Sequence, residues 1–452
     1  MATDNNNKIL NFSNKREQNE IHFDYAGREK IQGKNFLNVP NKRGPSETCF
    51  DSAERGVLRP KGNVPNLRFG GYSDEWSLNE LQKVATLSKG FGISKDQLSE
   101  NGTPCILYGE LYTKYNSEII SEVYSKTELD TSNLVKSKEN DVIIPCSGET
   151  AIDISTARCV PFNGVLLGGD LNIIRLKNQN GGFFAYQLNS KRKVDIAKVA
   201  QGVSVVHLYG EHLKRVKVAY PTYSEQKKIA DFLSLLDDRI ATQNKIIEDL
   251  KKLKVAITQK ISKDRFNKKV MLSELLTERC EKNKDLYPVH SVSVSEGVIN
   301  QVDYLGRSFA ANDISNYNVV YYGDIVYTNS PTGDFPYGIV KMSSIITKAS
   351  VSPLYGVYRP CSESIGIYLH NYFCNPLNAK NYLHKLIQKG AKNTINITNK
   401  RFLENEISLP SENLLNKYSL FISSFDLKIK LELKTLLLLQ RQKQYLLQQM
   451  FI

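Results

Sequence analysis

The chain has 452 residues, a length that predicts two or more domains, and 41% of its residues are hydrophobic, which is enough to build real cores. A net charge of +13 and a pI near 9.1 favour a polyanionic partner, although a soluble protein that is merely basic fits the charge equally well. The seven cysteines are scattered and never spaced as Cys-x-x-Cys, which argues against a disulfide framework or a zinc site and indicates reduced thiols.

Residues 1–62 are rich in Asn, Lys, Gly and Pro and show little periodicity, so we predict a poorly ordered leader. A nucleic-acid-binding arm is the alternative, but Asp and Glu are mixed with the basic residues. The first residues lack the apolar core of a signal peptide, and no apolar run is long enough to span a bilayer. We therefore expect a cytoplasmic protein without membrane contacts.

Residues 63–222 read as a mixed α/β domain, and Trp76, the only tryptophan, lies near its start. Short β-like runs are separated by Gly, Pro and Asn, and they lie at residues 105–108, 141–144, 164–167 and 171–176. Residues 183–200 look helical, and residues 203–206 and 216–218 are further strand candidates.

Residues 223–264 form one long predicted helix. Its apolar residues recur at alternating steps of three and four, which is the seam of a coiled coil: Ile229, Leu233, Leu236, Ile240, Ile247, Leu250 and Ile257. Polar residues interrupt this seam at Gln243 and Lys254.

Residues 265–411 repeat the order of the first domain, and residues 412–452 repeat the long helix. A shift that places Pro221 on Pro410 aligns a second seam with the first: Ile422, Phe425, Ile429, Leu436, Leu439 and Leu446. The polar interruptions align as well, with Glu432 on Gln243 and Lys443 on Lys254. We therefore predict an α+β protein with an internal two-fold repeat, in which two mixed α/β domains alternate with two long helices that pack as an antiparallel coiled coil.

The aligned polar positions are expected to fix the register of the two helices. In an antiparallel pair, we expect Lys254 to approach Glu432 and Gln243 to approach Lys443, unless these side chains simply face solvent. Outside the shared anchors the two domains differ in sequence, and similar frames with different loops favour the same task on two different targets.

Motifs of catalysis are missing from the sequence. It contains no phosphate-binding Gly-x-x-x-x-Gly-Lys-Ser/Thr loop, no Gly-x-Gly-x-x-Gly turn, no Gly-x-Ser-x-Gly elbow and no Asn-Pro-Pro-Tyr signature of amino-methyltransferases. The six histidines are not paired at metal-ligand spacing. We predict no catalytic residue, no metal and no cofactor for this chain.

Two motifs resemble the specificity subunit of type I restriction-modification systems. One is Pro65-Asn66-Leu67-Arg68-Phe69 followed by Trp76, and the other runs from Pro221 through Glu225-Gln226 into the first helical seam. The resemblance covers residue 65 to the C-terminus. The second repeat departs from it, because Leu414-Leu415 replace Glu225-Gln226, and the leader is longer than the family usually carries.

The resemblance implies a subunit without chemistry of its own. Each globular part would be a target-recognition domain for one half of a bipartite, asymmetric site in double-stranded DNA. The helices would hold the domains apart and dock two modification subunits, which carry the adenine methyltransferase activity and would bind S-adenosylmethionine, and a restriction subunit would add cleavage. A helix of about 38 residues spans about 55 Å, enough to separate two readers by one DNA turn of about 34 Å. The alternatives are a stand-alone DNA-binding regulator and a silent or scaffolding coiled-coil allele.

Contacts with DNA need Lys and Arg for phosphates and Arg, Asn, Gln, Ser and Thr on loops for bases. In the first domain this chemistry selects Tyr112, Lys114, Asn116, Ser147, Glu149, Thr150, Lys191, Arg192 and Lys193. In the second domain it selects Arg307, Asn329, Ser330, Thr332, Lys392, Asn393, Lys400 and Arg401. Ordinary solvated turns are the alternative for each cluster, and Tyr112 fits a core position equally well.

Overall fold

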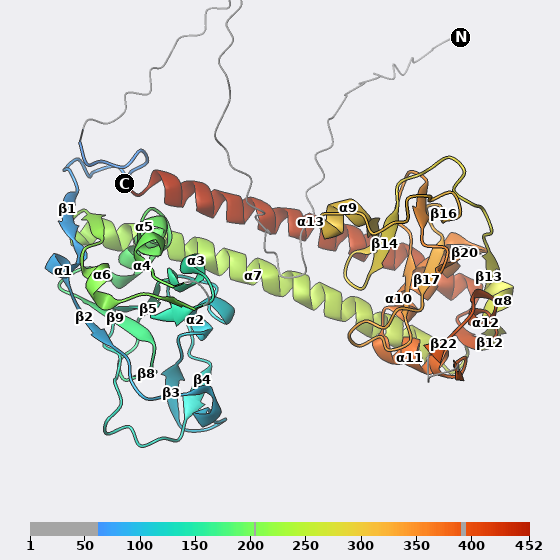
Figure 1. Cartoon of the computed structure of the whole chain (residues 1–452), viewed down its shortest axis with the longest axis horizontal. Coiled ribbons are helices and arrows are strands. Elements are labelled where there is room, and N and C mark those ends of the chain that lie inside the picture. The colour runs from blue at the N-terminus through green and yellow to red at the C-terminus, as the bar shows by residue number, and fades with distance from the viewer. Residues whose placement is uncertain (1–61, 203–204, 390–394) are drawn as a thin grey trace, which may run out of the picture. The chain divides into compact units, whose positions relative to one another are not determined.

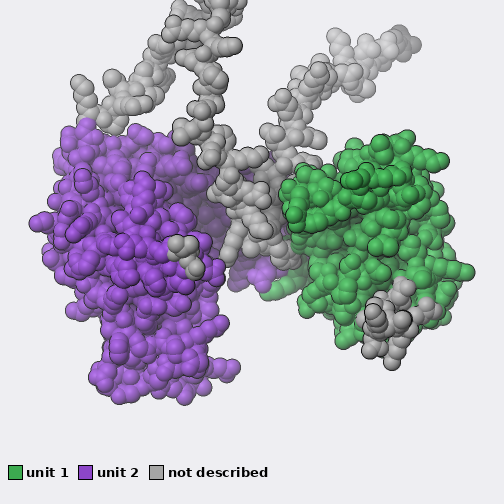
Figure 2. Space-filling model, in the orientation of Figure 1, with its two compact units in different colours: residues 1–48, 251–427 green, residues 49–250, 428–452 purple. Residues whose placement is uncertain are grey.

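The computed structural model describes residues 62–202, 205–389 and 395–452 (Figure 1). The predicted leader lies almost wholly outside these residues. The chain divides into two compact units (Figure 2), and of the described residues unit 2 holds 62–250 and 428–452, whereas unit 1 holds 251–427. Each unit therefore combines one globular domain with one part of each long helix.

Unit 2 is built on a four-stranded antiparallel sheet of order β2-β9-β5-β7, formed by Ala85–Lys89, Leu171–Leu176, Asp141–Pro145 and Arg158–Val160. The central strands β5 and β9 are almost entirely buried, since α4 (Gly181–Asn189) covers one face and a second apolar cluster around Ile143 and Ile173 fills the other. The smaller elements are β1 (Ser77–Glu80), α1 (Leu81–Val84), α2 (Glu110–Thr113), β6 (Ser147–Gly148), α3 (Ala151–Ile154), β10 (Val206–His207), α6 (Gly210–Lys214) and β11 (Lys217–Tyr220).

A small lobe of unit 2 carries β3 (Thr103–Ile106), β4 (Ser125–Thr127), β8 (Leu166–Leu167) and the short 3-10 helix Lys95–Gln97. It has its own apolar core of Ile93, Cys105, Leu107 and Leu166. Figure 1 shows this lobe extending away from the main sheet of the unit.

Unit 1 repeats the sheet with the order β13-β20-β17-β18, formed by Leu276–Glu278, Gly356–Pro360, Ile325–Thr328 and Ile339–Met342. Both units also pair the strand before a four-residue helix with the last strand before a long helix: β1 with β11, and β12 (Lys268–Met271) with β23 (Glu406–Leu409). The remaining elements are α8 (Leu272–Leu275), β14 (His290–Ser293), β15 (Gly297–Asn300), α9 (Gln301–Leu305), β16 (Asn318–Val320), β19 (Ala349–Val351), α10 (Glu363–Phe373), α11 (Pro376–His384), β21 (Gln388–Lys389), β22 (Ile395–Asn396) and α12 (Asn399–Phe402).

One buried aspartate opens the central strand in each unit. Asp141 accepts the backbone N–H of Lys138 at 2.8 Å and is held by the guanidinium of Arg175 at 2.7 and 2.9 Å. Asp324 accepts the backbone N–H of Tyr321 at 2.8 Å and is held by Arg279 at 2.8 and 2.9 Å. Arg175 lies on β9, whereas Arg279 directly follows β13. The two units therefore share the aspartate and its turn, but the position of the arginine differs between them.

The single helix expected over residues 183–200 is broken in two, and so is its counterpart in the second domain. Residues 183–200 contain α4 and α5 (Lys193–Val199), because Ser190 leaves the helical conformation and its hydroxyl donates to the carbonyls of Tyr186 and Gln187. Residues 368–388 contain the end of α10 and then α11, because Asn375 caps the new helix and Pro376 occupies its first turn.

The predicted long helices are α7 (Tyr223–Ser262) and α13 (Glu412–Gln449). Within unit 2, Ile229, Leu233 and Leu236 of α7 share one core with Leu439 and Leu446 of α13. Within unit 1, Ile257 of α7 and Ile422 of α13 belong to the core of the second domain. The start of each helix thus packs in the unit that holds the end of the other, which confirms the α+β fold with an antiparallel helix pair.

The entry into α7 is fixed by the two motif residues Glu225 and Gln226. Glu225 is 1% exposed and receives two 2.7 Å hydrogen bonds from the guanidinium of Arg68 in the first motif. Gln226 donates to the carbonyl of Pro221 and accepts the backbone N–H of Asn180, which opens α4. In the second repeat the matching Leu415 is buried in the apolar core of unit 1, so packing replaces the polar links.

We predict that Glu225→Gln lowers the free energy of unfolding of unit 2 by about 3 kcal/mol, because it leaves the Arg68 guanidinium nearly buried without its anion. Trp76 is the only tryptophan and is buried in the core of this unit, so its fluorescence during urea denaturation measures the change.

The control is Asp231→Asn, six residues further along the same helix, which breaks an exposed ion pair with Lys227 and should change stability little, because water screens both charges. Equal losses in the two variants would contradict a structural role for the buried pair.

Candidate functional site

The polar residues of the helix seams pair with one another in a regular way. In unit 2, Gln243 donates to the side chain of Glu432 and, at 3.2 Å, to its carbonyl oxygen. The two residues are 189 positions apart, so each is the repeat equivalent of the other. Such a contact between equivalent positions is what an antiparallel two-fold pair of helices produces at its centre.

Two lysine–aspartate pairs also connect the helices. In unit 1, Lys254 of α7 contacts Asp426 of α13 at 2.5 Å. In unit 2, Lys443 of α13 contacts Asp237 of α7 at 2.5 Å. Lys254 and Lys443 are repeat equivalents, as are Asp237 and Asp426. The expected contacts of Lys254 with Glu432 and of Gln243 with Lys443 are therefore wrong, because the antiparallel register places the aspartates opposite the lysines.

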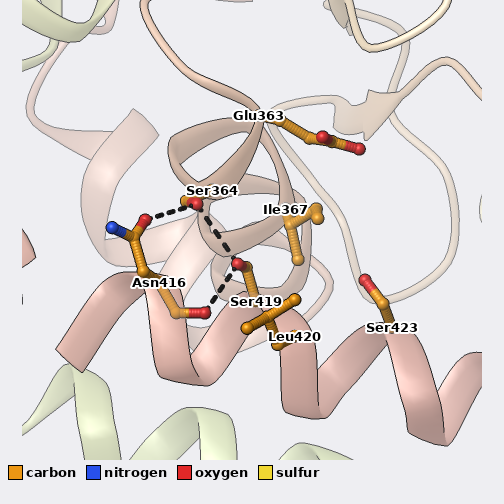
Figure 3. A pocket seen from close by; sticks show the side chains of 7 residues that line it. All are labelled: Glu363, Ser364, Ile367, Asn416, Ser419, Leu420 and Ser423. Atoms are coloured by element: carbon orange, nitrogen blue, oxygen red, sulfur yellow. Dashed lines mark hydrogen bonds between the residues drawn. The ribbon is translucent and has the colours of Figure 1, made fainter. Parts of the chain in front are cut away.

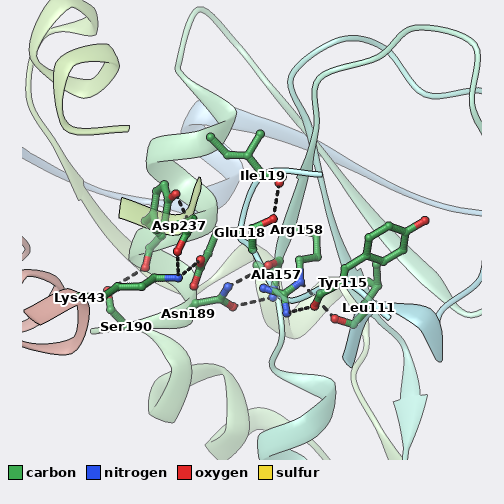
Figure 4. Close-up of polar contacts among 12 residues, drawn as sticks. Leu111, Tyr115, Glu118, Ile119, Ala157, Arg158, Asn189, Ser190, Asp237 and Lys443 are labelled. Atoms are coloured by element: carbon green, nitrogen blue, oxygen red, sulfur yellow. Dashed lines mark hydrogen bonds and ion pairs between the residues drawn. The ribbon is translucent and has the colours of Figure 1, made fainter. Parts of the chain in front are cut away.

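The two equivalent lysines differ in their surroundings. Asp426 is 52% exposed, whereas Asp237 is 8% exposed and also accepts a 2.7 Å hydrogen bond from the hydroxyl of Tyr186 in α4. Lys443 contacts a second buried carboxylate, Glu118, at 2.6 Å (Figure 4). One ammonium thus joins α13 to α7 and to the globular domain of unit 2.

The pKa values of the two carboxyl groups that contact Lys443 are shifted in opposite directions. Burial and then the charge of Glu118 raise the pKa of Asp237 to about 6. Burial opposes ionisation of Glu118 too, but Lys443 and Arg158 outweigh it and lower the pKa of Glu118. Burial also disfavours the charge on Lys443, and the two carboxylates overcome this and raise its pKa. At neutral pH the cluster has one cation and two anions, and the nearby guanidinium of Arg158 supplies a further positive charge.

Arg158 has a structural role and is too buried to contact DNA. It is buried, and its guanidinium donates to the carbonyl oxygens of Leu111 and Tyr115 at 3.1 and 2.7 Å (Figure 4). These carbonyls belong to α2 and the residues after it, where the predicted DNA-contact residues Tyr112, Lys114 and Asn116 lie. The buried cluster therefore positions the backbone of the first candidate loop.

The structure brings the first two candidate loops of unit 2 together. The hydroxyl of Tyr112 lies 3.8 Å from the position that a Cβ atom on Gly148 would take. Asn116 and Glu149 are exposed beside these residues, and Lys114 is exposed although it contacts Glu110 at 2.6 Å. Tyr112 is half-buried, so its ring is partly core and partly surface.

Several selected residues of unit 2 have structural partners. Ser147 is buried and donates to Asp170 at 3.0 Å, and Thr150 caps α3 by accepting the backbone N–H of Asp153. Arg192 donates to the backbone oxygen of Ile452 at 3.0 Å and contacts Asp195. Lys193 is half-buried, and burial followed by the charge of Arg158 lowers its pKa. Lys191 remains exposed.

In unit 1 the loop between β17 and β18 exposes Asn329, Ser330 and Thr332. The loop is held at its end, because Thr332 and Phe335 exchange backbone hydrogen bonds and Phe335 is buried. Lys400 is exposed, whereas Arg401 donates to the carbonyl of Leu386 at 2.9 Å. Lys392 and Asn393 lie outside the described residues. Ser147 and Ser330 follow matching strands but have different environments, one buried and one exposed.

Exposed aromatic residues are a feature that the sequence reasoning did not select. Phe309 is 58% exposed, and the guanidinium of Arg307 lies 4.4 Å from the centre of its ring, on the loop after α9. In unit 2, Tyr209 stacks with His207 and meets His212 edge-on. Aromatic residues next to basic ones in segments without a helical seam are the signal that would have found them.

The outward face of α13 carries a stripe of apolar side chains. The exposed fractions of these side chains lie between 52% for Leu431 and 74% for Leu420, and the stripe consists of Leu420, Leu427, Leu431, Leu438 and Tyr445. Their spacing of seven or four residues places them on one face of the helix. The equivalent positions of α7 are Asp231, Asp238, Thr242, Asp249 and Ala256, so the stripe belongs to α13 alone.

An open groove in unit 1 lies between α10 and α13 beside Leu420 of this stripe (Figure 3). Ser364 donates to the side chain of Asn416 at 2.7 Å and lies 3.2 Å from the hydroxyl of Ser419. Glu363 is the one titratable side chain that lines this groove. Nothing in its lining combines a nucleophile with a base.

Within the residues that the structure describes, no group of three or more His, Cys, Asp or Glu side chains is placed to hold a metal ion. The same residues include no helix that is long and apolar enough to cross a membrane.

Comparison with known proteins finds a family model that matches part of the chain. Residues 73–252 match the model of the type I restriction modification DNA specificity domain. The type I restriction enzyme MjaVIII specificity subunit of Methanocaldococcus jannaschii is 27% identical over 158 residues, which cover 34% of this chain and 35% of that protein. The aligned part thus spans about a third of the length of this curated relative.

Two solved structures share the fold over most of the chain. The type I restriction-modification S subunit from M. genitalium has a TM-score of 0.53 at 15% identity and covers 86% of this chain and 99% of its own. The chain thus shares the fold of this S subunit, and residues 73–252 are similar in sequence to the type I restriction modification DNA specificity domain. A chain from structural work on complex assembly and conformational transition of the type I R-M system has a TM-score of 0.50 at 13% identity, with 83% of this chain and 97% of that chain covered.

The specificity domain matched by sequence includes nearly all of the globular part of unit 2 and the first part of α7. It therefore contains Asp237, Glu118 and Arg158 of the buried cluster, and the Tyr112 and Gly148 loops. The structural matches extend the same fold through the second domain and α13.

We predict that Lys443→Met lowers the free energy of unfolding of unit 2 by about 3 kcal/mol at pH 8, because two buried carboxylates lose their cation. The loss should be smaller at pH 5. The pKa of Asp237 is about 6, above its ordinary 3.8, so its charged form weakens the fold as the pH rises from about 4 to 6, and below that range the proton removes the repulsion. Urea denaturation followed by Trp76 fluorescence at both pH values measures the difference.

The matched control is Lys254→Met, which breaks the equivalent pair in unit 1. Since Asp426 is half exposed, its loss should be about 1 kcal/mol or less and independent of pH, measured by circular dichroism. A Lys443 variant whose loss is the same at pH 5 and pH 8 would contradict the assignment of charges.

Proposed function

We propose that this chain is the sequence-specific DNA-recognition subunit of a type I restriction-modification complex, and that it reads a bipartite, asymmetric site. The observation that carries the proposal is the duplicated frame, in which both units have the same four-stranded sheet order and the same paired edge strands. Each domain is the reader of one half of the site. The modification subunits bind the methyl donor S-adenosylmethionine, and the complex works on double-stranded DNA in the cytoplasm.

The surface chemistry of the two domains supports two different half-sites. The domain of unit 2 exposes Lys114, Asn116 and Glu149 on the loops that meet at Tyr112 and Gly148. The domain of unit 1 presents Asn329, Ser330 and Thr332 on a hairpin loop, and it also exposes Arg307 against Phe309. Amides and hydroxyls on loops are base-reading groups, and lysines and arginines contact phosphates. The net charge of +13 suits a DNA partner.

The apolar stripe on α13 supports docking of another subunit on the helix pair. An exposed row of leucines along a long helix is the surface that an amphipathic partner helix covers. We propose that the stripe of Leu420, Leu427, Leu431, Leu438 and Tyr445 contacts a modification subunit, and that two such subunits assemble with the chain. A restriction subunit adds cleavage where one is present.

We predict that co-expression of the chain with its modification subunit produces a split adenine-methylation motif, which genome-wide mapping of methylated adenines detects. Neither protein alone should produce it. Exchange of residues 72–220 for those of another family member should change one half of the motif and leave the other, because that segment is the globular domain of unit 2.

A chain that copurifies with the modification subunit but yields no methylation would contradict the proposed function for this allele. A chain that binds DNA without the modification subunit and never copurifies with it would instead be a stand-alone regulator.

We predict that Leu438→Glu weakens binding of the modification subunit by about 2 kcal/mol, roughly thirtyfold, because it places a charge in the centre of the apolar stripe. The matched control is Leu433→Glu, since Leu433 is similarly exposed on α13 but points away from the stripe. Copurification and titration calorimetry measure the affinity. Equal weakening by both variants would show that the stripe is not the contact surface.

A further inference from the structure

Three titratable side chains meet in unit 1 at the join between the sheet and α10. Lys341 lies on β18, His370 on the last turn of α10, and Cys374 directly after that helix. The ammonium of Lys341 lies 3.2 Å from Cys374 Sγ, and His370 Nε2 lies 3.7 Å from it. None of the three was selected from the sequence.

Lys341 needs an anion. Its side chain is buried, and among the described residues no carboxylate lies within 4.0 Å of its ammonium. An ammonium inside a protein is stable only beside a negative charge. The sulfur of Cys374 is the group in contact with it, so the thiolate is the form that satisfies the lysine.

His370 reinforces the same state. The backbone N–H of Met342 donates to His370 Nδ1 at 3.1 Å, so this nitrogen carries no proton. The proton of the ring therefore lies on Nε2, which faces the sulfur and donates to it. The other titratable group near the sulfur is the phenol of Tyr418, whose pKa is raised mainly by burial and then by Asp426 and Cys374, so that it stays neutral.

The contrast with the other buried cysteines is large. Burial raises the pKa of Cys105 and Cys146 to about 11, so these thiols stay protonated. Burial acts on Cys374 in the same direction, but the contacts with His370 and Lys341 outweigh it and lower its pKa to about 6. A thiolate at neutral pH is the nucleophilic and oxidisable form of cysteine.

We propose that Cys374 is a redox modification site, at which a small peroxide oxidises the thiolate held by Lys341 and His370. The sulfur attacks one oxygen of hydrogen peroxide, so that the S–O bond forms and the O–O bond breaks. The sulfur loses two electrons, and the leaving hydroxide takes a proton from the solvent buffer and departs as water, so that Lys341 keeps its charge. The product is a sulfenic acid, which thiols reduce back to the cysteine.

Oxidation removes the charge that Lys341 requires, and this links the site to DNA recognition. Lys341 lies on the strand that returns from the loop bearing Asn329, Ser330 and Thr332. A neutral sulfenic acid leaves the buried ammonium unpaired, which loosens the β17–β18 hairpin at its base. Control of the half-site read by unit 1 rests on the proposed function, whereas the reactivity of the thiolate does not.

The first test is the pH profile of alkylation by iodoacetamide, followed by mass spectrometry of each cysteine peptide. Between about pH 6.5 and 8.5 the rate at Cys374 should change less than about threefold, because the thiol is already ionised. Cys280 and Cys361 are exposed in the same unit and serve as internal controls, whose labelling is followed in the same samples. A parallel rise at all three, or no labelling of Cys374 at any pH, overturns the proposal.

The second test uses Lys341→Met, which should slow alkylation of Cys374 at pH 7 by about tenfold, because the thiol then titrates at higher pH. Lys385→Met, an exposed lysine of the same unit, is the control and should leave the rate unchanged. If Lys341→Met fails to fold, the wild-type pH profile still decides the question.

The third test treats the chain with hydrogen peroxide and traps sulfenic acid with a cyclic 1,3-dione, expected first at Cys374, before the methylation assay with the modification subunit. Oxidised protein should lose methylation, and Cys374→Asp, which keeps the negative charge, should resist peroxide. Trapping at Cys374 with unchanged methylation overturns the link to recognition. If untreated protein gives no methylation, the proposed function fails while the thiolate chemistry stands. Dione trapping at Cys280 or Cys361 before Cys374 overturns the modification site itself.

Discussion

The structure depends on an antiparallel pair of long helices whose apolar seam is interrupted by charge. Apolar residues at steps of three and four explain why the helices associate, but they do not choose between neighbouring registers. Gln243 with Glu432, and lysine with aspartate on either side in sequence, supply that choice, because a shift by one turn would leave each of these groups unpaired. One of them, Lys443, extends the constraint into the globular domain of unit 2 through Glu118. Within unit 2, the contacts of Lys443 therefore fix both the register of the helices and the position of the globular domain against them.

Duplication of a frame and divergence of its surface explain most differences between the two units. The sheet order, the paired edge strands and the aspartate that opens the central strand occur in both. The two units differ in the position of the arginine that pairs with the aspartate, in the residues at the start of the long helix and in the side chains exposed on the surface. Asp141 takes its arginine from β9 and Asp324 from the end of β13, and Glu225 holds Arg68 where the second repeat buries leucine. Substitutions of this kind keep the backbone in place and leave the loops free to carry different chemistry.

Sequence reasoning succeeded where a short-range period determines the structure. The helical seam and its repeat need only spacing, so α7 and α13 were predicted within a few residues of their observed ends. It failed where a single residue ends a helix, as at Ser190 and Asn375-Pro376. It also failed for the polar contacts of the seam, since these depend on the exact offset of two chains that run in opposite directions. For the DNA-contact candidates, the sequence alone does not distinguish side chains that are free on the surface from side chains that have structural partners. Ser147, Thr150 and Arg192 are typical base- and phosphate-contacting residue types, yet their side chains are engaged in a sheet edge, a helix cap and the C-terminus.

Two lysines, Lys341 which is buried and Lys443 which is mostly shielded from solvent, show how the counter-ion decides what a charged site can do. Lys443 and Lys341 face the same physical problem, because an ammonium removed from water needs an anion beside it. Lys443 contacts two carboxylates, which change only by gaining a proton, so this cluster responds to pH and otherwise holds the helices. Lys341 contacts a sulfur, and a thiolate gives up electrons as well as accepting protons. The need of an ammonium for an anion therefore stabilises the helix pair in unit 2 and produces a reactive thiolate in unit 1. The difference is that Lys443 contacts carboxylate oxygens and Lys341 contacts a sulfur.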